Sequence, residues 1–232
     1  MEKNGFKFYF SGECMKKILT IISVLALMAV GSSAFAEMNL AFHLGHDFSN
    51  FVWDGNSSDV SETNFGLTAL KITDKNLALK WDVEGGAVHG DKLFNRDGGG
   101  GGGWVSFGLG KALARNEKMT LTLMPIFGFG FNMNTDEDSD NGVEDKEDKY
   151  EQDLFAVRMG VDVTGVFRLT KVLGIFTNLG LYYTVGSIEV KNKSYTPAQS
   201  VSGYEKTETD DSYPLNGWTF APSIGVSLSF GN

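Results

Sequence analysis

A strict alternation of side-chain size near the end of the chain is the feature that most limits what this sequence can fold into. From residue 217 to residue 230, every second residue is large and apolar or proline, and those between are small or polar. The first set is Trp218, Phe220, Pro222, Ile224, Val226, Leu228 and Phe230. Only a repeat close to two puts all large residues on one side, so the segment is predicted to be a β-strand.

The same alternation recurs along the chain and predicts seven further strands. The segment 64–72 is the least regular, because Leu70 and Ile72 fall on the polar face. Pro125 and Pro222 cannot donate a ladder hydrogen bond, and each predicts a β-bulge or a local twist. The seven strands are expected at 38–48, 64–72, 77–85, 104–114, 119–132, 153–169 and 173–186.

The connections between these strands alternate between long and short. Short connections are predicted at 73–76, 115–118 and 170–172, and long ones at 49–63, 86–103, 133–152 and 187–216. This order is typical of an up-and-down membrane barrel with short periplasmic turns and long extracellular loops. We therefore predict an all-β fold, an eight-stranded antiparallel up-and-down transmembrane β-barrel, with ten strands as the alternative count.

The composition of the two faces indicates which one points outward. A soluble periplasmic lipocalin-like binding protein would keep its large apolar residues inside and its charges outside. Here the polar face is mostly Gly, Ala, Ser, Thr and Asn, which suits the narrow interior of an eight-stranded barrel. The opposite face suits contact with outer-membrane lipids. Aromatic residues near strand ends are expected to form interfacial girdles: Phe48, Trp81, Trp104, Phe131, Phe155 and Trp218.

The start of the sequence has the pattern of a secretory signal. Met15-Lys16-Lys17 is basic, an apolar run follows, and Ala34-Phe35-Ala36 fits a signal-peptidase site. We predict a signal peptide over 15–36 and a mature barrel over 37–232, located in the bacterial outer membrane. Residues 1–14 do not fit a signal, and we expect translation to start at Met15.

The bulk charge argues against some partners and cofactors. The formal charge is −9, which disfavours binding to nucleic acid. Cys14 is the only cysteine and lies before the predicted cleavage site, so a mature disulfide or thiol centre is not expected. No cofactor is predicted.

The last strand resembles the assembly signal of bacterial outer-membrane barrels. Ser223, Gly225, Leu228 and Phe230 occupy its fixed positions, although such signals usually end on the aromatic residue and here Gly231 and Asn232 follow. The mature chain is similar in architecture to small barrels of the OmpA, OmpX and OmpW type. This resemblance implies insertion by the barrel-assembly machinery, and we expect a monomer.

Several charged residues fall on the face predicted to line the lumen. They are Lys80, Asp82, Glu84, Arg158 and Asp162, with Asp47 and His43 nearby. Charges in a narrow interior need partners, so a packed ion-pair network is favoured over a gated polar pathway. Arg158 is expected to pair across the lumen with Asp82 or Glu84.

Two other patterns suggest chemistry outside the lumen. Asp136, Asp138, Asp140 and Glu147 match part of a calcium-loop spacing, but Gly142 comes one residue late and a solvated acidic loop is favoured. His46, Asp47, Ser49 and His89 raise the alternative of a lipid-modifying enzyme, without the spacing of a nucleophile and its base. The chain is expected to be more a structural or surface-interaction protein than an enzyme, with an extracellular ligand or host surface as candidate partner and little channel activity.

Overall fold

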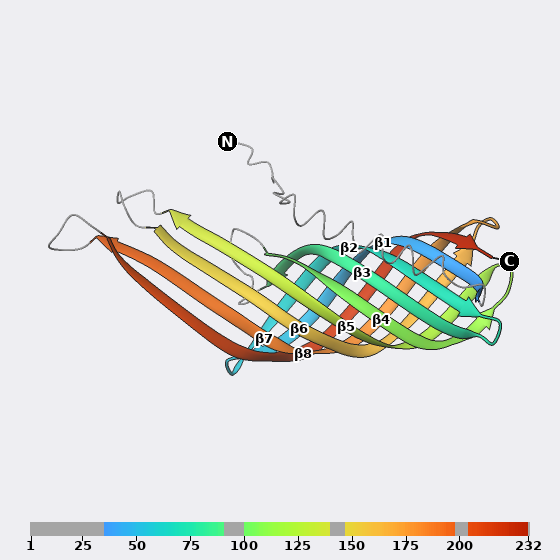
Figure 1. Ribbon diagram of the computed structural model, residues 1–232, viewed down its shortest axis with the longest axis horizontal. Coiled ribbons are helices and arrows are strands. Elements are labelled where there is room, and N and C mark those ends of the chain that lie inside the picture. Colours follow the sequence, from blue (N-terminus) through green and yellow to red (C-terminus); the bar gives the residue numbers. More distant parts are fainter. Residues whose placement is uncertain (1–34, 91–99, 140–146, 198–203, 232) are drawn as a thin grey trace. The chain divides into compact units, whose positions relative to one another are not determined.

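The described part of the chain is a single closed barrel. The computed structural model describes residues 35–90, 100–139, 147–197 and 204–231. Eight antiparallel strands pair in sequence order, and the last pairs with the first (Figure 1). The strands are β1 (Phe35–Trp53), β2 (Asn56–Thr73), β3 (Leu77–Gly90), β4 (Gly100–Arg115), β5 (Met119–Ser139), β6 (Glu147–Arg168), β7 (Leu173–Pro197) and β8 (Tyr204–Phe230). The predicted fold class is confirmed.

The predicted N-terminal segments fall almost wholly outside this region. Residues 1–14 and most of the predicted signal peptide over 15–36 are not among the described residues; β1 begins at Phe35. The cleavage site and the translation start therefore stay predictions. Within the described ranges, no helix is long and apolar enough to cross a membrane.

The strands are much longer than the predicted ones, and the long loops are largely arms of β-hairpins. Strand lengths run from 14 residues in β3 to 27 in β8, whereas about 9–11 residues cross a bilayer. In Figure 1 the far ends of β5 to β8 reach well past those of β3 and β4. The predicted loop boundaries were wrong because backbone pairing continues where side chains no longer alternate in polarity.

The first predicted loop, 49–63, shrinks to a two-residue turn. Asp54 and Gly55 both have positive φ, at 45° and 70°, which a type I′ hairpin turn requires. Strand pairing continues up to Trp53 and Asn56 on either side. The Asp-Gly pair was the signal in the sequence that could have revealed this hairpin.

The turn gives a small, testable effect on stability. Gly55→Val should lower the free energy of unfolding by about 1–2 kcal/mol, because a side chain disfavours the left-handed conformation. Asp54→Asn is the control, since asparagine tolerates that conformation, and should leave stability unchanged. Urea unfolding of the refolded barrel measures both, and equal effects would contradict the turn assignment.

The predicted bulges at the two prolines are wrong. The register shifts lie between Phe35 and Glu37 and between Ala112 and Ala114. At Pro125 and Pro222 the ladder to one neighbouring strand is interrupted, but the register is the same on both sides of the gap. Each proline removes one donor without adding a residue, so the strands stay aligned.

Candidate functional site

The lumen of the barrel is filled by alternating polar and apolar layers. Along β1, the inward-facing residues run from Glu37 through Ala41, His43 and Asp47 to Phe51, all of them buried. Glu37, Ala41 and Phe51 each mark a different layer, and His43 and Asp47 both belong to the layer between those of Ala41 and Phe51. The interior is therefore a stack of packed layers.

The layer nearest the chain ends is a charged cluster around Glu37. Its carboxylate pairs with Arg115 at 3.1 Å and with Arg168. It also accepts hydrogen bonds from Thr120 and Asn39 at 3.1 and 2.8 Å. These groups cross-link β1 to β4, β5 and β6 at the end that carries the short turns.

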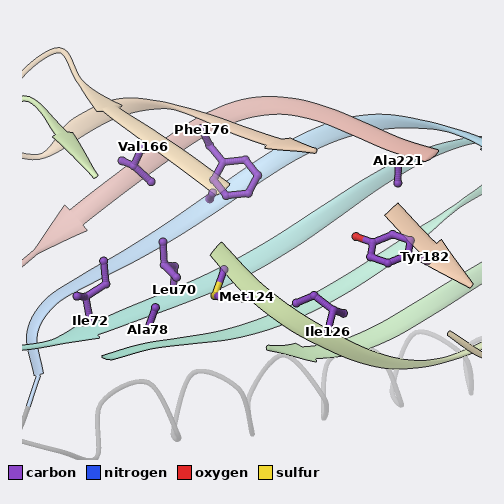
Figure 2. Close-up of a cluster of buried hydrophobic side chains, with 10 residues drawn as sticks. Leu70, Ile72, Ala78, Met124, Ile126, Val166, Phe176, Tyr182 and Ala221 are labelled. Atoms are coloured by element: carbon purple, nitrogen blue, oxygen red, sulfur yellow. The ribbon is translucent and has the colours of Figure 1, made fainter. Parts of the chain in front are cut away.

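An apolar layer follows, to which β1, β2, β3, β5, β6, β7 and β8 each contribute buried side chains. Figure 2 shows nine of the ten members labelled, gathered inside the ring of strands. Leu70 and Ile72, which break the alternation of β2, belong here and are buried. The layer comprises Ala41, Leu70, Ile72, Ala78, Met124, Ile126, Val166, Phe176, Tyr182 and Ala221. This apolar layer inside the barrel thus explains the irregular pattern of β2.

The middle layer brings together the five charged residues predicted for the lumen. Lys80 on β3 contacts Asp162 on β6 at 2.7 Å and Asp82 at 3.3 Å. Asp82 also accepts from Thr68 at 2.9 Å and contacts His43 Nε2 at 3.1 Å. Because a carboxylate only accepts, Nε2 of His43 carries the proton in that contact.

Arg158 occupies the centre of the middle layer. Of the two acids expected as its partner, the structure pairs it with Glu84, at 2.8 Å between Nη2 and Oε2. Its guanidinium also donates to Ser106 and lies between the rings of Trp104 and Tyr182, 4.6 and 4.5 Å from their centroids. Every face of this cation is thereby occupied, which is what a charge at 1% exposure requires.

A second apolar layer closes the far end of the lumen. It comprises Phe51, Val60, Val88, Trp104, Leu154, Ala156, Ile188 and Leu215. Trp104 was expected in an outer girdle, but it points inward and is 5% exposed. The indole ring of Trp104 lies against Gly130, where the Cβ of any other residue would overlap it, so the ring fills the space that this glycine leaves free. The sequence prediction also missed Glu62, which is buried here and accepts from Trp104 Nε1 at 3.4 Å.

The outer surface carries the large apolar side chains. Among the residues that the structure describes, thirty-two large hydrophobic ones are exposed, including Phe42 and Leu44 at 66% and Phe155 at 62%. A soluble lipocalin-like barrel would place such residues inside, so this arrangement contradicts that alternative. The exposed set suits contact with hydrocarbon, since closure also pairs the backbone of every strand.

The edge of this apolar surface can be followed across the strands. A row of paired, outward-facing residues runs from Leu181 through Phe220 and Phe48 to Ser61 and His89. These residues line part of a hollow of about 690 Å³ on the outer face. Along this row, the residues on β7, β8 and β1 are apolar, and those on β2 and β3 are polar. Because the strands are tilted, a row perpendicular to them rises along the barrel axis and so leaves the apolar surface.

The residues considered for enzymatic chemistry do not form a common centre. Asp47 and Ser49 face the lumen, where Ser49 shares a hydrogen bond of 2.8 Å with Thr219. His46 lies between them in sequence and contacts Thr63 at 2.9 Å in an exposed position, on the other side of the barrel wall. Strand geometry therefore keeps His46 apart from Asp47 and Ser49, while His89 lies on the outward-facing row with Ser61.

The remaining predicted positions are placed as follows. Leu228 and Phe230 of the assembly signal are exposed on the outer face, while a Cβ on Gly225 would overlap the carbonyl oxygen of Phe42. Among the calcium candidates, Asp136 and Asp138 lie on β5 and Glu147 begins β6. Asp140 lies outside the described residues, and the calcium site stays a prediction.

The comparisons with known proteins find similarity of structure only. No protein-family model matches the chain, and no curated protein matches it. Among solved structures, Neisserial surface protein A is 10% identical over 82% of this chain and 97% of that one, with a TM-score of 0.42. A major outer membrane protein from Thermus thermophilus is 12% identical over 82% of this chain and 99% of that one, with a TM-score of 0.44. The outer membrane protein AlkL in lipid bilayers is 14% identical over 87% of this chain and 93% of that one, with a TM-score of 0.45. At these identities the likeness is one of fold alone.

The class of protein follows from the geometry of this chain itself. A closed barrel of eight antiparallel strands with an apolar outer surface and a polar, filled interior is the architecture of small outer-membrane barrels.

Proposed function

We propose that this chain is an integral outer-membrane β-barrel protein, exported by a cleaved signal peptide, with a structural or surface-interaction role and little or no channel activity. The observation that carries the proposal is the contiguous set of exposed Phe, Leu, Val, Ile and Met side chains around a closed barrel. Such a surface is stable in contact with lipid acyl chains, and as an exposed patch it would be far larger than soluble monomers tolerate.

The proposal is tested by fractionation and by heat modifiability. The protein should enrich in the outer-membrane fraction, and its band on a detergent gel should shift after boiling, because closed barrels resist unfolding by the detergent alone. A band that neither enriches nor shifts would overturn the membrane assignment. The same preparation also tests the predicted monomer by its size in micelles.

The surface role is supported by the hairpin arms beyond the apolar surface. On β6 to β8 these arms carry Asp153, Glu189, Asp210 and Asp211 around Lys191. Lys191 contacts Glu189 at 3.3 Å and Asp153 at 3.6 Å, and its hydrogen bond to Glu189 raises the pKa of Lys191. A mostly acidic ribbon of this kind suits an extracellular ligand or host surface with basic groups.

Absence of a channel is the most direct electrical prediction. Purified protein in planar bilayers should give at most small, infrequent conductance steps, because two apolar layers and the Arg158 layer block the lumen. Large, stable steps from the unaltered protein would contradict the proposal.

A further inference from the structure

The middle layer of the lumen, taken together with Glu62 at its border with the second apolar layer, has more acids than bases. Its inward-facing charged residues, all at least nine-tenths buried, are the acids Asp47, Glu62, Asp82, Glu84 and Asp162 and the cations Lys80 and Arg158. Lys80 serves Asp82 and Asp162, while Arg158 serves Glu84 at 2.8 Å and Asp47 at 3.7 Å. Among these described residues, Glu62 is the carboxylate with no salt bridge to either cation. A buried negative charge of this kind needs compensation.

A small cavity lies beside Glu62, the carboxylate without a salt bridge. It measures about 10 Å³, close to the lower limit for one water molecule or ion. Its walls include Asp47, Glu62 and Asn132, with the hydroxyls of Ser49 and Thr219 and with Arg158. Within the described part of the chain, Glu62 Oε1 and Asn132 Oδ1 are buried oxygens that receive no hydrogen bond. Both are acceptors, and both belong to residues that line this cavity.

The position of Asn132 is fixed by the strand beside it. Asn132 on β5 pairs with Gly102 on β4, and a Cβ on Gly102 would overlap Asn132 Oδ1. Any other residue at Gly102 would therefore displace this oxygen. Asp47 is held in turn by Asn64, whose Nδ2 donates to it at 3.1 Å. The two sides of the cavity are thus set by the barrel wall.

We propose that this cavity, between Asp47 and Glu62, binds one small monovalent metal cation of the sodium type. The available donors are all oxygens, which suit hard cations and not soft ones. Arg158 is shared between Glu84 and Asp47, so a monovalent ion beside Glu62 would compensate the carboxylate that has no salt bridge of its own. A cavity of about 10 Å³ has no room for the coordinated water molecules that a divalent ion such as Mg²⁺ usually keeps. A water molecule would satisfy the free oxygens but would leave the charge of Glu62 uncompensated.

The experiment measures thermal stability of the purified full-length barrel in detergent at constant chloride concentration. Choline is replaced stepwise by sodium. The melting temperature should rise and saturate, by about 3–6 °C at ten times the dissociation constant, because the ion binds only the folded barrel. Glu62→Gln keeps the shape of the side chain and removes the charge, so this variant should not respond to sodium. Glu117→Gln, in a turn at the opposite end, is the matched control and should respond like the unaltered protein.

The other outcomes overturn the proposal. Equal melting curves in sodium and choline would exclude the ion. If stability instead depended on pH with sodium inert, a proton on Glu62 would be the compensating charge. An equal sodium response in Glu62→Gln would place any bound ion elsewhere. If Glu62→Gln does not fold, Asp47→Asn takes its place, and the comparison of sodium with choline in the unaltered protein still decides. The proposal requires the closed barrel but not the surface role.

Discussion

Replacing Arg158 with methionine should lower the free energy of unfolding of the barrel by about 3–5 kcal/mol, the usual cost of removing one partner from a buried ion pair. Methionine fills much of the space between Trp104 and Tyr182, so the loss is mainly electrostatic. Glu84 would remain buried without the contact of 2.8 Å that it makes with Arg158. Urea unfolding in lipid vesicles, followed by tryptophan emission, gives the free energy.

A double variant separates charge from packing. Arg158→Met combined with Glu84→Gln removes both charges of that pair and should recover part of the stability, while Asp47, which lies 3.7 Å from Arg158 in the unaltered protein, stays without this cation. Lys191→Met removes an exposed ion pair with Glu189 and should behave like the unaltered protein. If the double variant were as unstable as the single one, Arg158 would act through packing or through Asp47 and not through Glu84.

The membrane-spanning part of the fold could be predicted because lipid requires an apolar side chain at every second position of each strand. Lys80, Asp82 and Glu84 alternate with apolar residues on β3, and Arg158 and Asp162 do so on β6. β3 and β6 are separated by two strands on one side of the ring, so the inward-facing residues of both strands point into the same narrow lumen. Alternation alone therefore predicted that these five side chains face the lumen, whereas their common level depends on the register of the strands.

The parts that could not be predicted lie where that rule stops. Glu62 fell inside a predicted loop, since beyond the bilayer both faces of β2 are polar and the alternation disappears. Trp104 was expected in an outer girdle because of its size, although alternation puts it on the face of Ser106 and Gly108. Leu70 and Ile72 did not fit the alternation because they point into the lumen, where an apolar layer stands in place of the expected polar residues. In all three places side-chain packing within the barrel, and not the lipid, decides the residue type.

Val161→Arg should destabilise the barrel by about 2–4 kcal/mol in lipid vesicles, because it places a charge near the middle of the hydrocarbon layer. Val161 is 45% exposed and lies on the outer face of β6, directly opposite Pro125 on β5 and Leu181 on β7. Its neighbour Asp162 faces the lumen, so the substitution leaves the ion-pair network intact. Urea unfolding in vesicles is again the measurement.

The control for this prediction is the same substitution at the end of the barrel. Val172 is 51% exposed and lies in the turn between β6 and β7, where an arginine side chain reaches the lipid headgroups. Val172→Arg should cost only about 0–1 kcal/mol. A membrane protein must respond to depth in this way, whereas a soluble barrel would accept arginine equally at both exposed positions. Equal effects at Val161 and Val172 would therefore show that water, and not lipid, surrounds the apolar surface.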